Sequence, residues 1–350
     1  MTKRTRDGAA LAGVLTGVLA GATVAVGPAV AQDKTLTISV YSFSQDEFEE
    51  LVYQPFEAIC GCDIVVETGN SVERLSKIEA NKDDPVIDMA VLSTHDALAA
   101  ARKGLLQPID VAALSNYDKL YDIAKDPLGE NLGVGYTFYA TSIVYRTDKV
   151  SIESWADLLS PELAGNVALP DVTTNQGPPA LYMLGKALGD ADPALTAPME
   201  AVGEKVDDIV TFYVRSSQLA QLMQQEEIWA APVGRFAWGR FKDNGLPMAW
   251  ATPKEGQTGG MNVMIMTANN GNEELALQFM DYWLSTEVQT KLAEALIDSP
   301  ANAEVVVSDE IAANLTYGAD VVATLDLIPP SVILDRRATW LEQWNDKVVQ

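Results

Sequence analysis

The most constraining feature of this sequence is an alternation of strand and helix patterns over its first hundred or so residues. Apolar runs that suit buried strands are each followed by a segment whose apolar residues recur at helical spacing. The expected strands are 36–40, 63–67 and 86–92, and the helices that follow them are 46–59, 71–80 and 95–103. This order predicts a mostly parallel sheet with helices on both faces, and therefore an α/β fold. Later strands are expected at 142–145, 166–169, 228–233 and 262–266, and later helices at 273–296 and 337–349.

The loops that follow the expected strands carry side chains suited to ligand recognition. In open α/β sheets, ligands bind beyond the carboxyl ends of the strands, where backbone N–H groups at helix N-termini point outward. These loops hold hydroxyls, amides and aromatic rings, with few acids or nucleophiles: Ser42–Gln45, Gly69–Ser71, Ser93–His95, Tyr136–Tyr139 and Thr173–Gln176. Their composition favours a recognition cleft over a catalytic centre.

Composition and motifs exclude several functional classes. The 350 residues carry a formal net charge of −25, which makes nucleic acid a poor partner. One His and two Cys cannot assemble a His-rich zinc site or an iron–sulfur cluster, so no metal or cofactor is expected. The sequence has no nucleophile-elbow, Walker, zincin or dinucleotide-binding motif. We therefore expect a binding protein rather than an enzyme, with an exported hydrolase that uses paired carboxylates as the alternative.

The N-terminus has the pattern of an export signal. Three basic residues precede an uncharged stretch over 8–30, and the stretch ends in Ala-Val-Ala at Ala31. This pattern predicts a signal peptide over residues 1–31 and a mature protein in the periplasm, with an N-terminal membrane anchor as the alternative. In that oxidising compartment, Cys60 and Cys62 have two possible states: a short disulfide, which is favoured, or two buried free thiols.

Segments in the middle of the chain resemble a known family. Residues 154–158 read Ser-Trp-Ala-Asp-Leu and residues 161–165 read Pro-Glu-Leu-Ala-Gly, and the segments 104–110 and 273–285 add to the likeness. In an exported α/β chain of this length, these segments resemble the extracellular solute-binding proteins of ABC importers. The branch they resemble holds the spermidine/putrescine binders.

This resemblance implies a two-lobed periplasmic-binding-protein fold of the type II kind, with two chain crossovers between the lobes. The expected boundaries are 32–138 plus 268–350 for the first lobe and 139–267 for the second. A small-molecule solute would be held between the lobes, and the closed protein would dock on a membrane permease. We expect a monomer.

The resemblance also implies a site, and the sequence departs from the polyamine pattern there. Thr174 and Asn262 stand where polyamine binders carry acids that pair with ammonium groups, whereas Arg215 and Arg235 lie in strand-end loops. Because guanidinium groups recognise carboxylates, we expect a carboxylate-bearing solute such as an amino acid or amino-acid-like zwitterion, with a polyamine as the alternative. The expected ligand contacts are Phe43, Ser44, Ser93, Thr94, His95, Tyr136, Tyr139, Thr174, Arg215, Arg235, Trp238 and Asn262.

Each of these assignments has a structural alternative. Instead of contacting a ligand, Arg215 or Arg235 could simply pair with a surface acid. The aromatic residues Trp238 and Tyr136–Tyr139 have the alternative of packing in a core.

Overall fold

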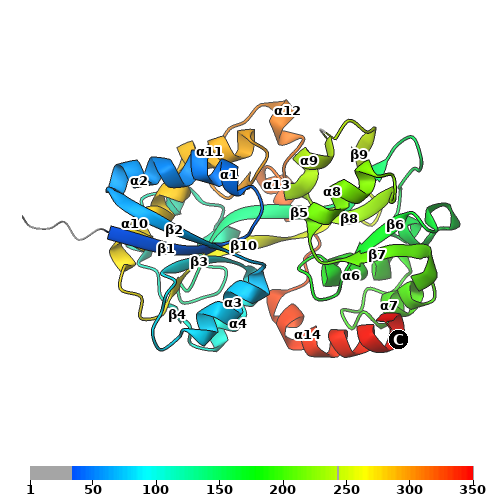
Figure 1. The fold of residues 1–350 in the computed structure, drawn as a ribbon, viewed down its shortest axis with the longest axis horizontal. Coiled ribbons are helices and arrows are strands. Elements are labelled where there is room, and N and C mark those ends of the chain that lie inside the picture. The colour runs from blue at the N-terminus through cyan, green and yellow to red at the C-terminus, as the bar shows by residue number, and fades with distance from the viewer. Residues whose placement is uncertain (1–33, 243, 350) are drawn as a thin grey trace, which may run out of the picture. The chain divides into compact units, whose positions relative to one another are not determined.

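The computed structural model describes residues 34–242 and 244–349, so the predicted signal peptide lies outside the described residues. Its framework is one mixed sheet. The strands are β1 (Lys34–Val40), β2 (Cys62–Thr68), β3 (Met89–Ser93), β4 (Leu106–Gln107), β5 (Val134–Arg146), β6 (Val167–Pro170), β7 (Ile209–Tyr213), β8 (Ala230–Gly234), β9 (Met248–Trp250), β10 (Thr258–Thr267) and β11 (Ser299–Pro300). Their order is β2-β1-β3-β10-β5-β8-β6-β7, with β4 paired to β10 and with β9 and β11 paired to β5 (Figure 1).

Helices pack around this sheet. They are α1 (Gln45–Phe48), α2 (Gln54–Cys60), α3 (Ser71–Ala80), α4 (Thr94–Arg102), α5 (Asp122–Lys125), α6 (Gly177–Ala187), α7 (Thr196–Gly203), α8 (Ser216–Gln224), α9 (Trp238–Lys242), α10 (Glu273–Trp283), α11 (Thr286–Glu294), α12 (Asp309–Ala312), α13 (Ala319–Ala323) and α14 (Pro330–Trp344). A π-helical turn, Glu49–Tyr53, joins α1 to α2, so the predicted helix over 46–59 forms as one continuous segment. Short 3-10 turns fill several of the connections.

The first lobe forms around a core that combines residues from 36–138 with residues from 261–301 and Val322. In β1, alternate residues Leu36, Ile38 and Val40 are at most 1 % exposed, as the period of a half-covered strand requires. Strands β1, β2 and β3 are parallel, as predicted. Helix α3 begins in a capping box in which Asn70 and Glu73 satisfy each other's backbone N–H groups.

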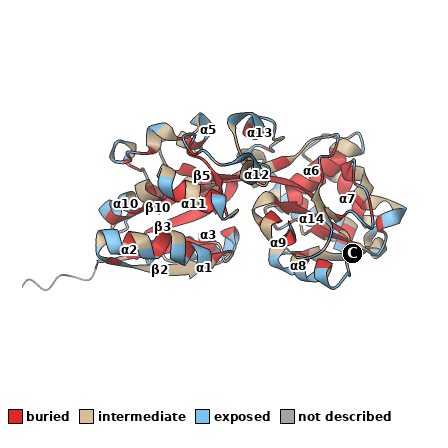
Figure 2. Ribbon diagram, turned by 90° about the horizontal axis from the view of Figure 1, so that it is seen from above, coloured by how far each residue is buried: buried red, intermediate tan, exposed pale blue. Residues whose placement is uncertain are grey.

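The second lobe forms around two smaller clusters on opposite faces of β5-β8-β6-β7. Consecutive residues of β5 point to opposite faces, so Ile143 joins one cluster and Val144 the other. The first of these clusters holds Trp155 of the predicted Ser-Trp-Ala-Asp-Leu motif, which is fully buried and donates its Nε1–H to Gly256 O at 3.0 Å. Figure 2 shows the buried strands enclosed by helices with exposed outer faces.

Two long strands, β5 and β10, connect the lobes. They run antiparallel to each other along Val134–Thr141. Beyond this pairing, β10 pairs with β3 of the first lobe and β5 pairs with β8 of the second. The sheet is therefore mixed rather than mostly parallel, because the chain crosses to the second lobe and returns. Gly259 and Gly260 permit this close pairing, since a Cβ atom there would lie 2.1 Å from Tyr139 O and 2.4 Å from Tyr139 Oη respectively.

The end of the chain differs from the predicted assignment of 268–350 to the first lobe. The apolar residues Ile333, Trp340 and Trp344 of α14 are buried in a core cluster of the second lobe. The polar face of α14 also contacts α4 of the first lobe, where Arg337 pairs with Asp96. The chain thus passes between the lobes a third time after residue 323, whereas two crossovers were predicted. The exact lobe boundaries stay a prediction.

Cys60 and Cys62 form a disulfide in the structure, the state that the sequence analysis favoured. Gly61 lies between them at φ +62°, a backbone region that favours glycine. The bond joins the end of α2 to the start of β2, far along the sheet from the inter-lobe strands.

Candidate functional site

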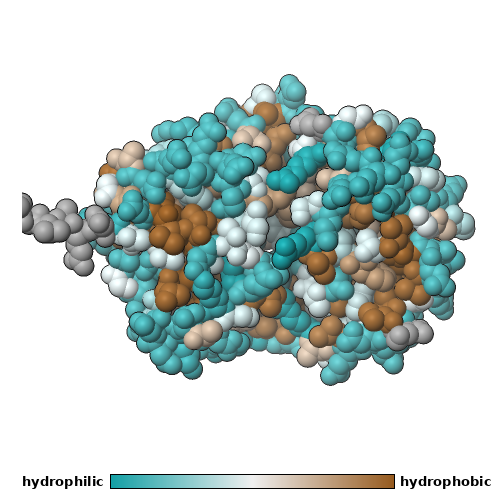
Figure 3. Space-filling view, in the orientation of Figure 1, coloured by the Kyte–Doolittle hydropathy of each residue, from teal (hydrophilic) through white to brown (hydrophobic). Residues whose placement is uncertain are grey.

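A cavity of about 760 Å³ lies between the lobes, at the loops that follow the strands. We call it the central cavity. Figure 3 shows the surface hollowed between the two lobes and strongly hydrophilic side chains across the hollow. The residues that line it are 41–43, 69–74, 76, 137–139, 173–176, 214–217, Phe236, Arg240, Asn262 and Asp298.

The structure places five of the predicted contacts on the wall of the central cavity: Phe43, Tyr139, Thr174, Arg215 and Asn262. Asn262 sits where the β10 register shifts, and such a bulge re-aims a side chain. The Thr174 hydroxyl is already used within its loop, because it donates to Asp171 O at 2.7 Å and accepts from Gly177 N. That these residues contact a ligand stays a prediction.

An aromatic corner forms one side of the cavity. The ring of Phe236 meets those of Phe43 and Tyr139 edge to face, with centroids 5.7 Å apart in both pairs. The guanidinium of Arg240 lies 4.2 Å from the centroid of Phe43. Phe43 belongs to the first lobe and Phe236 and Arg240 to the second, so this corner joins the lobes through direct contacts.

Five further predicted contacts lie behind the cavity wall rather than on it: Ser44, Ser93, Thr94, His95 and Tyr136. Except for Thr94, they are buried. Two of them use their hydroxyls within the protein: the Ser93 hydroxyl donates to Asp96 at 2.9 Å and the Thr94 hydroxyl donates to Met261 O at 2.7 Å. Ser93 and Thr94 were predicted as contacts from their place in a strand-end loop, but their hydroxyls bond inward to the protein.

Arg235 and Trp238, also predicted as ligand contacts, are not among the residues that line the central cavity. Arg235 Nε donates to Asn314 O at 3.0 Å, and its guanidinium stacks on Trp238 and Trp250. The Trp238 indole N–H donates to the Asn314 side chain at 2.7 Å. These contacts attach the turn before α9 to the segment after α12, so Arg235 and Trp238 support the cavity wall from outside.

Three charged residues that line the cavity were not predicted from the sequence: Arg74, Arg240 and Asp298. Arg74 is only 5 % exposed and lies on the face of α3 that also carries Ser71 and Leu75. That spacing could have identified Arg74 from the sequence. A basic residue on the buried face of an amphipathic helix is rare unless it has a partner, so it indicates a functional or structural role. Asp298 and Arg240 carried no comparable pattern.

Burial sets the ionisation of the two innermost charges. Burial lowers the pKa of Arg74 to about 10, so it remains a cation at neutral pH. Burial also raises the pKa of Asp298 to about 7, against the lowering effect of hydrogen bonds from Tyr41 and Thr137. Glu73, the other carboxylate on the wall, is used in the α3 capping box, where it accepts from Asn70 N at 2.8 Å.

A buried ionic network links the wall to α14. Asp96, whose side chain is inaccessible to solvent, accepts from Arg337 Nη1 at 2.7 Å and lies 3.8 Å from His95 Nε2. Burial raises the pKa of Asp96, but the charges of His95 and Arg337 and its hydrogen bonds outweigh this effect and hold the pKa below its usual range. Burial lowers the pKa of His95, and Asn175 on the cavity wall acts on that pKa in the opposite direction.

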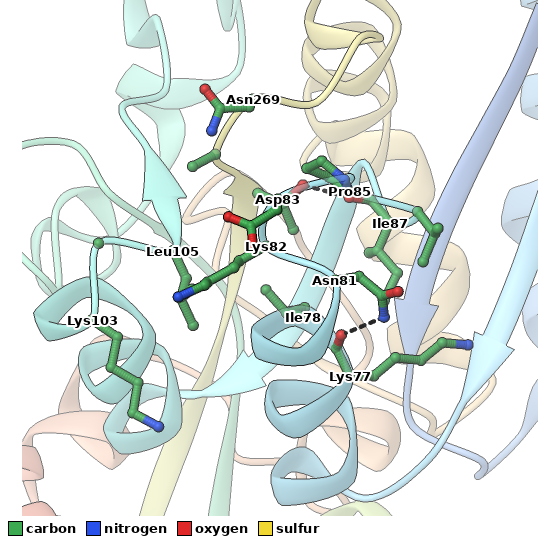
Figure 4. Close-up of a pocket in the computed structure, with 14 residues that line it drawn as sticks. Lys77, Ile78, Asn81, Lys82, Asp83, Pro85, Ile87, Lys103, Leu105 and Asn269 are labelled. Carbon is green, nitrogen blue, oxygen red and sulfur yellow. Dashed lines mark hydrogen bonds between the residues drawn. The ribbon is translucent and has the colours of Figure 1, made fainter.

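A second cavity, of about 240 Å³, lies in the first lobe between the end of α3 and the end of β10 (Figure 4). Three lysines are among the residues that line it. Two of them have partners, because Lys77 pairs with Glu67 and Lys103 Nζ lies 2.5 Å from Glu79. Its size and these pairings make it a weaker solute site than the central cavity.

The described residues contain no cluster of three or more acidic, His or Cys side chains that could hold a metal ion. Within the same residues, no helix is long and apolar enough to cross a membrane.

Two α/β lobes joined by paired strands around one large inter-lobe cavity define a solute-binding protein. The family model for bacterial extracellular solute-binding proteins matches residues 52–319. The chain belongs to this family, and it is the solute-binding component of an ABC transporter.

Individual relatives agree with this assignment. The chain is 27 % identical over 288 residues to the spermidine/putrescine-binding periplasmic protein of Escherichia coli K12, covering 80 % of this chain and 82 % of the relative. It is 27 % identical over 368 residues to a putrescine-binding periplasmic protein of the same organism, covering 95 % and 98 % of the two chains. The crystal structure of an ABC transporter from Clostridium perfringens is similar at a TM-score of 0.74 and 31 % identity, covering 89 % of this chain and 99 % of that one.

These findings confirm three expectations from the sequence. The resemblance to the solute-binding proteins of ABC importers, the two-lobed α/β fold and the periplasmic localisation all hold. The family is one of transport proteins rather than of enzymes.

Proposed function

We propose that the protein captures a small carboxylate-bearing solute, such as an amino-acid-like zwitterion, in the central cavity and delivers it to its permease without chemical change. The observation that carries this proposal is the charge of the cavity wall. Three guanidiniums line it, from Arg74, Arg215 and Arg240, against two carboxylates, from Glu73 and Asp298. Both lobes contribute cations, so an anionic group between them would be attracted from two sides.

A polyamine is the second candidate, because the relatives reported above are named for spermidine and putrescine binding. The aromatic corner would suit the methylene chain and ammonium groups of such a ligand. A diamine, however, requires two counter-charges in a desolvated site. Glu73 is exposed and bonded to the start of α3, which leaves Asp298 alone, and three guanidiniums would repel the ligand.

A thermal-shift screen tests the proposal. Amino acids, dicarboxylates and diamines are added separately to the purified protein, and each solution is assayed afterwards for chemical conversion. A solute present at 100 times its dissociation constant stabilises the folded protein by ~2.7 kcal/mol. We expect stabilisation by carboxylate-bearing solutes and recovery of the solute unchanged. Turnover of the solute would favour the exported-hydrolase alternative.

Arg215→Ala is expected to weaken binding of the carboxylate-bearing solute by roughly 10- to 100-fold, because a charged hydrogen bond contributes ~1.5–3 kcal/mol. The side chain is 68 % exposed and its nearest acid, Glu73, is 4.0 Å away, so the unfolding free energy should hardly change. Isothermal titration calorimetry and urea unfolding measure the two effects. Arg336→Ala, at an exposed position of α14 outside the cavity, is the control. Equal affinity of both variants and wild type would remove Arg215 from the site.

The protein is further expected to be a monomer that closes on its solute. The lobes are joined by strands and by the segment before α14, and a ligand in the cavity contacts both of them. Small-angle X-ray scattering should give a monomeric mass and a lower radius of gyration at saturating solute. An identical scattering profile with and without solute would contradict closure.

A further inference from the structure

Arg74 is a buried cation that lines the central cavity and has a side-chain donor without a partner in the part of the chain that the structure describes. Its Nη1 donates to Gly69 O at 2.6 Å, but its Nε has no hydrogen-bond partner among the described residues. Within the described part of the chain, no carboxylate lies within 4.0 Å of its guanidinium, although Asp96 and Glu73 act on it at longer range. A guanidinium that is 5 % exposed and has no paired anion is costly to keep unless a ligand supplies the anion.

Asp298 is a buried acidic residue that lines the same cavity, and among the described residues it has no basic partner nearby. It is 7 % exposed, and it accepts hydrogen bonds from the Tyr41 hydroxyl at 3.1 and 3.2 Å. Within residues 34–242 and 244–349, no basic side chain lies within 4.0 Å of its carboxylate. Tyr41 and Tyr136 both interact electrostatically with Asp298 and with Arg74.

Above about pH 7, where Asp298 is ionised, two unpaired charges of opposite sign therefore line one cavity and do not pair with each other. A diamine would satisfy Asp298 and leave Arg74 without an anion, whereas a dicarboxylate would do the reverse. Only a ligand that carries both signs compensates both, and each uncompensated buried charge costs several kcal/mol.

We propose that Arg74 binds the carboxylate and Asp298 the ammonium group of an amino-acid-like zwitterion, so that the first lobe alone recognises both ends of the solute's charge pair. This inference rests on the proposed function and deepens it. Arg74 comes from α3 and Asp298 from the turn before β11, both in the first lobe. Arg215 and Arg240 of the second lobe then contact the solute from the other side as the lobes close.

Matched probes test the inference by calorimetry. The probes are the twenty protein amino acids, 4-aminobutyrate and 5-aminovalerate, together with the diamines putrescine and cadaverine and the dicarboxylates succinate and glutarate. We expect wild-type protein to bind at least one zwitterion, and to bind it at least 100-fold more tightly than the diamine or dicarboxylate of similar length. Failure to bind any zwitterion overturns the inference.

Two charge-deleting variants give the sharper result. Arg74→Gln should weaken zwitterion binding at least 100-fold and shift the preference toward diamines. Asp298→Asn should weaken it as much and shift the preference toward dicarboxylates. A purely structural role would lower affinity for all probes alike and would not reverse the order, and this uniform loss overturns the inference. Arg336→Gln and Glu50→Gln, at exposed positions outside the cavity, are the matched controls.

The outcomes separate this inference from the proposed function. If succinate or glutarate binds and no zwitterion does, the carboxylate proposal stands, but the assignment of Arg74 and Asp298 to the two ends of a zwitterion fails. If putrescine or cadaverine alone binds, both fail. Circular dichroism and the midpoint of thermal unfolding establish that each variant is folded before its affinity is interpreted.

Discussion

Arg337→Ala should lower the free energy of unfolding by ~3–5 kcal/mol at neutral pH, a large effect for a partly exposed surface residue. The substitution removes the guanidinium that pairs with Asp96, whose carboxylate is fully inaccessible to solvent, and a buried charge without its partner costs about this much. His95 lies 3.8 Å away and can take up a proton in compensation, so the loss should fall nearer the lower figure. Urea unfolding followed by tryptophan fluorescence measures the change.

The matched control lies on the same helix interface. Arg102 of α4 pairs with Asp335 of α14 at 2.6 Å, but both side chains are about half exposed, so Arg102→Ala should cost less than 1 kcal/mol. Similar losses for the two variants would show that burial of Asp96 is not the cause.

Acid pH provides a second check on the Arg337 prediction. Because the folded-state pKa of Asp96 is lowered, its contribution to stability is complete above the unfolded pKa of ~4 and is lost as the pH falls below it. The deficit of Arg337→Ala should therefore shrink in acid. The pKa of His95, which burial lowers and Arg337 lowers further, should rise in the variant. His95 is the only histidine of the chain, so a nuclear magnetic resonance titration reports it without overlap.

Asp298→Asn should stabilise the solute-free protein by up to ~4 kcal/mol above neutral pH and should have little effect near pH 4. Burial raises the pKa of Asp298 to about 7, so between pH ~4 and ~7 the folded protein holds a proton that the unfolded chain has released. Wild-type stability therefore falls as the pH rises through that window. Asparagine keeps an oxygen that accepts from Tyr41 and removes the buried charge.

Urea unfolding at pH 4.5 and pH 8 measures this difference, with Glu50→Gln at an exposed position as the control. Equal stabilities of Asp298→Asn and wild type at pH 8 would show that the carboxylate is well solvated in the open cavity. If Asp298→Asn is more stable than wild type yet binds zwitterions more weakly, the Asp298 carboxylate lowers the stability of the fold and is kept for ligand binding.

Much of the fold could be predicted from the sequence because local patterns determine it. The alternate apolar residues of β1 and the helical spacing in α3 need no knowledge of tertiary structure. The mixed sheet could not be foreseen in the same way, because the direction of β10 depends on a return crossing between lobes. Nor could the place of α14, whose Trp340 and Trp344 fill a core that forms from distant segments.

The site was predicted less well, for a physical reason. A strand-end loop brings a residue near the cavity, but the direction of its side chain depends on packing, so Phe43 lines the wall while Ser93 bonds inward to Asp96. Arg235 was selected for its charge and its loop, yet backbone carbonyls and aromatic rings beside α9 hold it. Asp298 reaches the cavity from near the end of the chain, a contact that no local pattern predicts.

Mass spectrometry of the small molecule released when the purified protein is denatured tests the central claim most directly. Tight binders of this kind retain their solute through purification if dissociation is slow. We predict a released molecule that contains at least one carboxylate together with an amine, in near-stoichiometric amount from wild type and depleted from Arg74→Gln. Release of spermidine or putrescine, in equal amounts from wild type and from Arg74→Gln and Arg215→Ala, would contradict the account.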